Sequence, residues 1–348
     1  MKFNEKFQID GRMIGLGQEP YIIAEMSANH GGQFDKAVQI IHEAKKSGAH
    51  AIKLQTYTAE TLTLDCKQKH FEAKGAWKGE YLYDLYTRGS MPWEWTEELQ
   101  KISKDIGITL FSSPFDFSAV DFLESLNMPA YKIASPELID IPLIKRVAET
   151  GKPIIMSTGG ATLQQIEEAV ESVYDEGVRD LAILKCTSEY PAPVERVNLI
   201  TINDLIKRFK CVVGISDHTI GSAIPIASVA IGASIIEKHF LVDKDYKTID
   251  SFFSALPKEM QDICDGASMV FRALGRVDYA SVSQTSRSLI AIKDITKGEK
   301  LINNFNFKSL RPGGGIEPKY LKTINGSLAK VDIPYGSLLD WDLIGIDN

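Results

Sequence analysis

The chain has 348 residues, of which 44% are hydrophobic and 24% are charged, and its formal net charge is −7. A chain of this length can bury a large core and forms either one big domain or two. Its negative charge excludes a general attraction to nucleic acid or to an anionic membrane, so any anionic substrate needs a local cluster of cations.

The N-terminal segment and the cysteines indicate a cytoplasmic protein. The first fifteen residues, MKFNEKFQIDGRMIG, are charged from the start and lack the apolar region of a signal peptide. No apolar run approaches the roughly 20 residues that a membrane span needs. The four cysteines are scattered without C-x-x-C spacing, which argues against a disulfide framework or a zinc ribbon.

Eight short apolar runs alternate with amphipathic stretches along the first four fifths of the chain. The runs cover residues 21–27, 51–56, 108–114, 131–136, 153–159, 181–187, 211–217 and 234–240. Their richness in Ile, Val and Leu suits strands that are buried on both faces of a parallel sheet. Between them, residues 34–44 and 170–174 carry apolar stripes at helical spacing, and Gly48 and Gly177 fit the ends of those helices.

Eight repeats of strand and helix predict a (β/α)8 TIM barrel. A doubly wound open sheet is the structural alternative, but no G-x-G-x-x-G follows the first strand. One interval is longer than the others, and the aromatic stretch at residues 71–95 fills much of it. This stretch predicts an ordered insertion over one end of the barrel, either as a substrate wall or as a packed surface excursion.

The tail has a different pattern. From about residue 283 it consists of short strands with Lys-Gly and Tyr-Gly turns, which is typical of a small β-rich domain. SVSQTSRS, at residues 281–288, is a plausible linker. We therefore predict a barrel domain over residues 1–280 and a β-rich domain over residues 285–348.

Polar and charged residues follow nearly every predicted strand. In a (β/α)8 barrel the active site lies at the C-terminal ends of the strands. The residues at those positions are Glu25, Lys53, Gln55, Ser113, Lys132, Ser135, Ser157, Thr158, Lys185, Ser188, Ser216, Asp217, His218, Glu237 and His239. A single Lys or Ser at such a position is usually just a solvated strand end. So large a set predicts that these residues form one functional site at the mouth of the barrel.

His218 and His239 follow adjacent strands, so they can lie close enough to share a metal ion. A site with two histidines and open positions suits Mn²⁺, Fe²⁺ or Zn²⁺ equally by ligand type. Hydrogen-bonded structural histidines are the alternative, and the pattern alone does not separate the two.

Lysines at the strand ends point to an anionic substrate. Lys53, Lys132 and Lys185 end three different strands, and serines and the free backbone N–H groups of MSTGG add further donors. Such a combination predicts a phosphate or carboxylate site.

The chain resembles the sialic acid synthase family in eight ordered motifs, which are IIAEMSANHGG, KLQTYT, SSPF, YKIAS, MSTGGAT, CTSEYPAP, GISDHTIGS and IEKHF. LRPGGGI in the tail resembles the C-terminal antifreeze-like (SAF) domain of that family. The resemblance implies a TIM barrel followed by a SAF domain. It also implies condensation of phosphoenolpyruvate with an open-chain amino sugar, cleavage of a C–O bond, release of phosphate, and help from a divalent metal (Mn²⁺, Mg²⁺ or Co²⁺).

Within the family the chain is most similar to the branch that makes pseudaminate from 2,4-diacetamido-2,4,6-trideoxy-altropyranose. The YKTIDSFFS, SANH, LQTYT and LKCTS segments carry this similarity, whereas RPGGG is more like the neuraminate branch. N-acetylneuraminate or legionaminate synthases are the alternatives within the family. A non-catalytic glycan-binding protein is the alternative from a different class.

The resemblance also implies roles for single residues. His218 and His239 correspond to the metal ligands, and Glu25 and Lys132 lie at the reacting centre. Glu25 either handles a proton and the attacking water or simply holds Lys53 or Lys132 in place. The positions that correspond to phosphoenolpyruvate contacts are Lys53, Ser113, Lys132, Ser135, Ser157, Ser188 and Ser216. The positions that correspond to sugar contacts are Gln55, Glu137, Tyr190, Asp250 and Arg311.

Three further expectations concern orientation, specificity and assembly. Asp217 and Glu237 precede the histidines and are expected to orient them. Phe252 and Phe253 are expected to offer an apolar patch to the C6 methyl group of the sugar, although burial in the core is the default for either ring. The family also implies a domain-swapped homodimer in which Arg311 from the tail of one subunit reaches the sugar in the barrel of the other.

Overall fold

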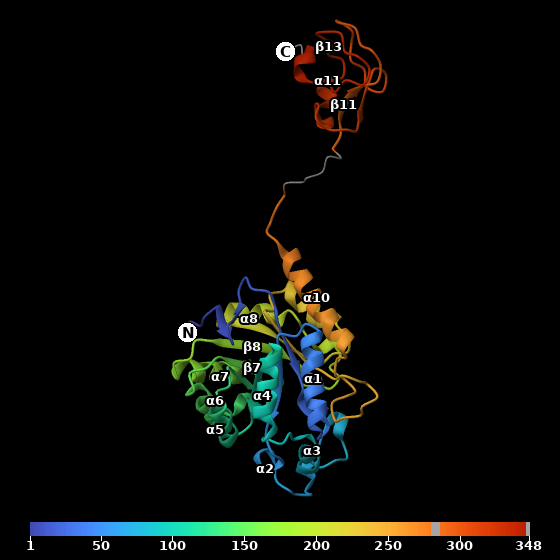
Figure 1. Cartoon of the computed structure of the whole chain (residues 1–348). Coiled ribbons are helices and arrows are strands. Elements are labelled where there is room, and N and C mark those ends of the chain that lie inside the picture. The colour runs from blue at the N-terminus through green and yellow to red at the C-terminus, as the bar shows by residue number, and fades with distance from the viewer. Residues whose placement is uncertain (280–285, 346–348) are drawn as a thin grey trace. The chain divides into compact units, whose positions relative to one another are not determined.

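The computed structural model describes residues 1–279 and 286–345, which belong to two compact units, Met1–Gly275 and Arg276–Asn348 (Figure 1). The central part of the predicted linker, residues 281–285, lies outside the described residues. No helix in the described ranges is both long enough and apolar enough to cross a bilayer.

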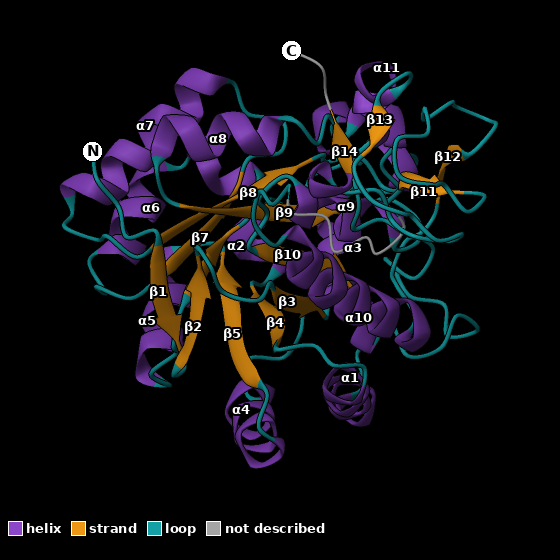
Figure 2. Ribbon diagram, turned by 90° about the horizontal axis from the view of Figure 1, so that it is seen from above, coloured by secondary structure: helices purple, strands orange, loops and turns teal. Residues whose placement is uncertain are grey.

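The first unit is a closed barrel of eight parallel strands that follow one another in chain order (Figure 2). The strands are β3 (Tyr21–Glu25), β4 (Ala51–Thr56), β5 (Thr109–Pro114), β6 (Tyr131–Ile133), β7 (Ile154–Ser157), β8 (Leu181–Cys186), β9 (Val212–Asp217) and β10 (Ile235–His239). β10 pairs with β3 and closes the ring. All eight runs predicted as strands are strands, and the predicted (β/α)8 barrel is confirmed.

A helix follows each barrel strand and lies outside it (Figures 1 and 2). These helices are α1 (Phe34–Lys46), α4 (Trp95–Ile106), α5 (Phe117–Ser125), α6 (Ile141–Ala148), α7 (Leu163–Asp175), α8 (Thr201–Phe209), α9 (Ala223–Ala230) and α10 (Pro257–Leu274). Short 3₁₀ helices in the connections are η1 (Ser27–His30), η4 (Pro136–Ile139) and η5 (Val194–Arg196).

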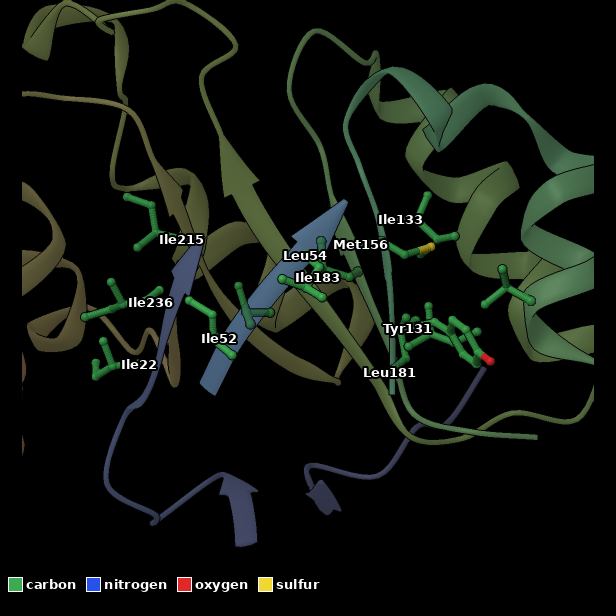
Figure 3. Packing of buried hydrophobic residues seen from close by; sticks show 14 of the residues in the cluster. Ile22, Ile52, Leu54, Tyr131, Ile133, Met156, Leu181, Ile183, Ile215 and Ile236 are labelled. Carbon is green, nitrogen blue, oxygen red and sulfur yellow. The ribbon is translucent and has the colours of Figure 1, made fainter. Parts of the chain in front are cut away.

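Alternation along the strands sorts side chains into two layers, because successive residues of a strand point to opposite faces. One face packs against the helices, and Ile22, Ile52, Ile183 and Ile236 belong to this layer (Figure 3). The other face fills the interior of the barrel with Tyr21, Ile23, Ala51, Phe111, Ala130, Ile155, Ala182, Leu184, Val212 and Ile235. The same alternation decides which residues at the strand ends enter the mouth.

A hairpin that the sequence analysis did not identify packs onto the interior layer. It consists of β1 (Lys6–Ile9) and β2 (Arg12–Gly15), and its apolar face joins the interior cluster. Asp10 and Gly11 both have positive φ, as a type I′ turn requires. Alternating apolar residues on both sides of Asp10-Gly11, in KFQI-DG-RMIG, are the sequence signal of such a hairpin.

The long interval between β4 and β5 forms an ordered insertion. It contains α2 (Ala59–Leu62), η2 (Lys69–Phe71), η3 (Gly75–Trp77) and α3 (Leu82–Gly89). Trp77 contacts the ring of Tyr190, which follows β8. The insertion therefore reaches the end of the barrel at which the polar strand ends lie.

The second unit is small and rich in β-structure, as predicted. It contains β11 (Ser288–Ala291), β12 (Phe307–Leu310), η6 (Pro318–Tyr320), α11 (Leu321–Ile324), β13 (Leu328–Ala329), η7 (Trp341–Leu343) and β14 (Ile344–Gly345). β11 pairs with β12 and β13 pairs with β14, both antiparallel. A separate apolar cluster, which includes Leu289, Phe307 and Ile333, is its core.

Candidate active site

The mouth of the barrel is lined by residues that continue the interior side of each strand. Counting in steps of two from the interior apolar residues reaches Glu25, Lys53, Ser113, Lys132, Ser157, Cys186, Ser216, Glu237 and His239. Most of them are almost fully buried. Because all eight strands contribute, residues far apart in the sequence form one polar cluster at the C-terminal end of the barrel.

The positive charge of Lys53 is balanced by close partners. Its ammonium group forms an ion pair with Glu25, donates to Ser113 Oγ at 3.3 Å and lies 3.9 Å from Glu237. Burial lowers the pKa of Lys53, but the two carboxylates outweigh burial and raise it. Lys53 therefore stays charged with its partners inside the protein.

The positive charge of Lys132 is balanced less completely. Its Nζ donates to the carbonyl oxygen of Ile133 at 2.9 Å, and its charged partner, Glu237, is 3.9 Å away. Burial lowers the pKa of Lys132, and Glu237 offsets this only in part. A buried ammonium group without a close counter-ion gains most from an incoming anion, so Lys132 is the stronger candidate for an anion contact.

The serines predicted to contact phosphoenolpyruvate differ in their hydrogen-bond partners. Ser157 is buried and its Oγ has no hydrogen-bond partner among the described residues. Ser135 Oγ accepts the N–H of Gly159 at 3.0 Å, and Ser188 Oγ lies so close to the same glycine that a Cβ atom there would collide with it. Ser216 Oγ donates to Glu237 at 2.9 Å. Hydroxyl donors thus accompany the two cations.

Glu25 sits where it can exchange a proton. It is almost fully buried and accepts hydrogen bonds from the N–H of Ser27 at 3.1 Å and from Gln55 Nε2 at 3.0 Å. Burial raises its pKa to about 7, although Lys53 opposes the rise. A carboxyl group with a pKa near neutrality is suited to general acid–base work. The ion pair with Lys53 shows that Glu25 also holds that lysine, so both expected roles have a basis in the structure.

The two histidines lie side by side, with ring centroids 5.3 Å apart. His218 Nδ1 is 2.9 Å from the carbonyl oxygen of Thr187, which can only accept, so Nδ1 carries a proton and Nε2 has the lone pair of the neutral ring. Burial lowers the pKa of His218, but Cys186 and the Thr187 carbonyl outweigh burial and raise it. His239 Nδ1 has no hydrogen-bond partner, and the nearest carboxylate oxygen, on Asp250, is 3.7 Å away. Burial and the nearby positive charges hold the pKa of His239 well below its usual value, so His239 is neutral.

Asp250, a predicted sugar contact, is carried by the loop between β10 and α10. Its carboxylate is buried and accepts the Ser27 hydroxyl at 2.5 Å, and burial raises its pKa. Asn29 holds the same loop in place. Its Nδ2 donates to the Phe240 carbonyl at 2.9 Å and to Ser254 Oγ at 2.8 Å, and its Oδ1 accepts the Thr248 hydroxyl at 2.5 Å. Three hydrogen bonds of Asn29 and one of Ser27 therefore fix the loop to η1.

Aromatic rings border the two histidines. Tyr190 stands 4.4 Å from the His218 ring and Phe253 stands 4.7 Å from the His239 ring, between centroids. Phe253 is buried, whereas Phe252 is 48% exposed. Phe253 thus has the position expected for an apolar wall beside the site, and Phe252 extends it outward.

The three other predicted sugar contacts have different surroundings. Gln55 lies next to Glu25, as described above, on the interior side of β4. Glu137, in η4, lies near Lys132 and lines a cavity of about 470 Å³ with Phe115 and Ile139. Burial raises the pKa of Glu137 to about 7, and its Oε2 has no hydrogen-bond partner. Arg311 is an exposed residue of the second unit.

For three residues, the direction of the side chain differs from the role predicted at the mouth of the barrel. Lys185 follows the outer, helix-facing side of β8, and its Nζ donates to the Cys186 carbonyl and to Thr187 Oγ1. Asp217 also lies on the outer side, where it forms a buried ion pair with Lys238. Neither residue belongs to the mouth, because residues an odd number of positions from an interior residue point to the opposite, outer face of the strand. Glu237 does enter the mouth, but it bridges the two lysines and does not orient a histidine.

Several residues of the site were not singled out from the sequence. Cys186 points into the mouth, 3.9 Å from His218 Nδ1. Burial raises the pKa of its thiol, but His218 and neighbouring hydroxyls outweigh burial and lower it to about 7. Cys186 lies two positions after the interior residue Leu184, and this spacing predicts that it faces the mouth. Asn29 and Trp77 gave no comparable signal, because their partners are far away in the sequence.

Comparison with known proteins agrees with this arrangement. A family model described as the NeuB family matches residues 40–279, and a model described as the SAF domain matches residues 286–345. The first match alone spans more than half of the chain. The chain belongs to the NeuB family.

Relatives place this NeuB-family protein among the nonulosonic acid synthases. It is 42% identical to the pseudaminic acid synthase of Helicobacter pylori over 320 residues, which is 90% of this chain and 94% of the relative. It is 34% identical to the N,N'-diacetyllegionaminic acid synthase of Campylobacter jejuni over 318 residues, 88% of this chain and 95% of the relative. The crystal structure of the spore coat polysaccharide biosynthesis protein SpsE of Bacillus subtilis superposes with a TM-score of 0.68 at 30% identity, covering 99% of this chain and 100% of that one.

The clamp formed by Asn29 predicts a local effect of its removal. In Asn29→Ala, three hydrogen bonds to the loop are lost, and each contributes on the order of 1 kcal/mol. Amide hydrogen exchange of residues 246–254 should become at least about tenfold faster while exchange in the barrel strands changes little. Thr248→Ser keeps its hydroxyl and should exchange like the natural protein. Equal acceleration throughout the barrel would mean that Asn29 supports the whole core and is not a loop clamp.

Proposed function

We propose that this protein is a pseudaminic acid synthase. It would condense phosphoenolpyruvate with 2,4-diacetamido-2,4,6-trideoxy-β-L-altropyranose, in its open-chain form, to give pseudaminate and phosphate. The observation that carries the proposal is the pairing of two buried lysines around Glu237 beside two histidines at one barrel mouth. The identity to pseudaminic acid synthases, which exceeds that to a legionaminic acid synthase, supports the choice of sugar.

Phosphoenolpyruvate carries a phosphate and a carboxylate, and the two lysines are assigned to these groups. Lys132 takes the more important contact, because its own counter-ion is distant. Ser157 supplies a hydroxyl that has no partner in the protein. Both charges are buried, so each contact to the anion is made in surroundings of low dielectric and is stronger than it would be in water.

The reaction forms one C–C bond and breaks one C–O bond. C3 of phosphoenolpyruvate attacks the aldehyde carbon of the sugar, which turns the aldehyde oxygen into an alkoxide. Water adds to C2 and gives one proton to the Glu25 carboxylate, and Glu25 passes this proton to the alkoxide. The bond between C2 and the bridging oxygen then breaks, phosphate leaves with the remaining hydroxyl proton, and C2 becomes the keto carbon of the product.

The chemistry of the two histidines fits a divalent metal such as Mn²⁺, Mg²⁺ or Co²⁺. His218 directs Nδ1–H to a carbonyl and keeps Nε2 free, and His239 is a neutral imidazole whose buried Nδ1 lacks a partner. No group of three or more His, Cys, Asp or Glu residues suited to a metal occurs in residues 1–279 or 286–345, so a bound metal would keep open positions. When bound, the metal would act as a Lewis acid that polarises the aldehyde.

Metal removal provides one test. We expect exhaustive chelation to abolish phosphate release and Mn²⁺, Co²⁺ or Mg²⁺ to restore it. His218→Ala and His239→Ala should each lower kcat/KM by at least about 100-fold, since Lewis-acid assistance is worth several kcal/mol. Far-UV circular dichroism should remain that of the folded barrel. A protein that stays fully active after chelation would exclude the two-histidine site.

The pKa of Glu25 predicts a pH profile. Because burial raises it to about 7, the carboxylate that accepts the proton of water becomes populated as pH rises through 7. The rate constant kcat/KM should therefore climb with pH and level off above that value. In Glu25→Gln this rise should be lost and kcat should fall by about 10² to 10⁴. If Glu25 only holds Lys53, the Gln variant will instead raise KM for phosphoenolpyruvate and keep the rise.

The identity of the sugar is tested with an acceptor panel. Phosphate release would be measured with phosphoenolpyruvate, Mn²⁺ and each of three acceptors: the diacetamido-trideoxy-altrose, the acceptor of legionaminate synthases, and N-acetylmannosamine. We expect turnover with the first and at least about tenfold lower kcat/KM with the others. Efficient turnover of N-acetylmannosamine would reject the pseudaminate assignment. No phosphate release with any sugar would favour the non-catalytic glycan-binding alternative.

Assembly is proposed to be a domain-swapped homodimer in which Arg311 acts in trans. His239→Ala and Arg311→Ala proteins, each nearly inactive, would be mixed under conditions that exchange subunits. Each heterodimer should then regain one site, which combines the intact barrel of one chain with the intact tail of the other. If exchange is seen by native mass spectrometry but no activity returns, Arg311 does not act across subunits.

A further inference from the structure

Two segments that are distant in the sequence meet beyond the histidines and form one apolar wall. One is the insertion between β4 and β5, which contributes Trp77. The other is the loop after β10, which contributes Phe252 and Phe253. The Trp77 ring lies 5.4 Å from Tyr190 and 6.1 Å from Phe252, and Phe252 lies 5.0 Å from Phe253, between centroids. Trp77, Tyr190, Phe252 and Phe253 are called the aromatic wall below.

The outer part of the aromatic wall offers no free polar group to a ligand. The single donor of the indole, Nε1–H of Trp77, is used by the Ile249 carbonyl at 3.3 Å. Phe252 and Phe253 have none. The only side-chain hydroxyl of the wall belongs to Tyr190, at its inner end beside His218.

Polar side chains next to the outer wall already have partners. Trp77 and Phe252 also line a cavity of about 1110 Å³, together with Glu80, Arg88 and Lys247. Arg88 forms an ion pair with Glu80. Lys247 Nζ donates to the Lys244 carbonyl at 3.0 Å. A new hydroxyl group placed against the outer wall therefore finds no hydrogen-bond partner on the rings of the wall itself.

The wall leads away from the histidines. Tyr190 and Phe253 touch the two histidines, whereas Trp77 and Phe252 follow behind them. With the aldehyde carbon, C1, at the histidines, C6 is the carbon farthest along the open chain. A sugar that extends along the wall would place C6 at Trp77 and Phe252.

We propose that Trp77 is a specificity-determining residue that selects a methyl group over a hydroxymethyl group at C6 of the acceptor. This inference rests on the proposed function and deepens it. A methyl group gains from burial against the indole and the Phe252 ring, whereas the hydroxyl of a hydroxymethyl group gains no hydrogen bond from either ring. The insertion thus contributes to substrate choice and is not only a surface excursion.

The test compares one ratio among variants of the full-length protein. The ratio is kcat/KM for the diacetamido-trideoxy acceptor divided by kcat/KM for the same sugar with a hydroxyl group at C6. Trp77→Gln supplies an amide that can pair with the hydroxyl, and the ratio should fall by about tenfold or more. Trp77→Phe keeps an apolar ring and should retain most of the ratio. KM for phosphoenolpyruvate should remain within about twofold in both variants, since the wall does not contact the lysines.

Trp93 provides the matched control. It lies in the same insertion, and its indole N–H also donates to a backbone carbonyl, that of Tyr57, at 3.3 Å. It also lines the cavity of about 1110 Å³, but it stacks on Phe122 and not on the aromatic wall, so it separates an effect of the wall from an effect of the cavity. Trp93→Gln should therefore leave the ratio unchanged.

The outcomes separate this inference from the proposed function. If the natural protein turns over neither acceptor, the proposed function fails first. If it turns over the deoxy acceptor but Trp77→Gln keeps the natural ratio, the inference is overturned. Phe252→Gln alters an exposed position that the fold tolerates, so it serves if Trp77→Gln does not fold. An unchanged ratio in Phe252→Gln would then overturn the inference equally.

Discussion

The burial of Lys53 and Lys132 around one carboxylate, Glu237, is the constraint on which the rest of the site depends. Removing an ion from water costs several kcal/mol, and the cost is offset only by close partners. Lys53 has such partners in Glu25 and Ser113, whereas Lys132 has a carbonyl oxygen and a carboxylate 3.9 Å away. The barrel thus holds one cation that is satisfied and one that is incomplete. In the proposed function, the anionic substrate supplies the missing partner of Lys132.

The site combines two chemical environments on one rigid frame. Charged and hydroxyl groups come from the strand ends themselves, whose positions are fixed by the parallel pairing of the barrel. The aromatic wall comes from loops, which are less constrained by the sheet and vary more readily. Hydrogen bonds from Asn29 fix the loop after β10 to η1, and the hydrogen bond of Trp77 joins the insertion to the same loop. In the proposed function, anion binding therefore depends on the barrel and choice of sugar depends on the loops.

The sequence predicted the barrel and most of the polar residues of the mouth, because both depend on local patterns. Each apolar run marked a strand, and the residue types at its end marked the site. Lys185 and Asp217 were wrongly placed in the mouth. Each lies an odd number of positions after an interior residue of its strand, Leu184 or Val212, so its side chain points to the outer face. Trp77 and Asn29 could not be found in this way, since their roles come from contacts with residues more than 100 positions away.

The most direct measurement is the binding of phosphoenolpyruvate by calorimetry, without acceptor sugar, to the natural protein and to two lysine variants. Loss of one partner of a buried charge pair costs on the order of 2 kcal/mol or more, so Lys132→Met should weaken binding by at least about 30-fold. Lys185→Met, which removes a lysine on the outer side of the same barrel, should bind like the natural protein. Equal affinity in Lys132→Met and the natural protein would contradict the account, because the incomplete cation would then have no part in holding the anion.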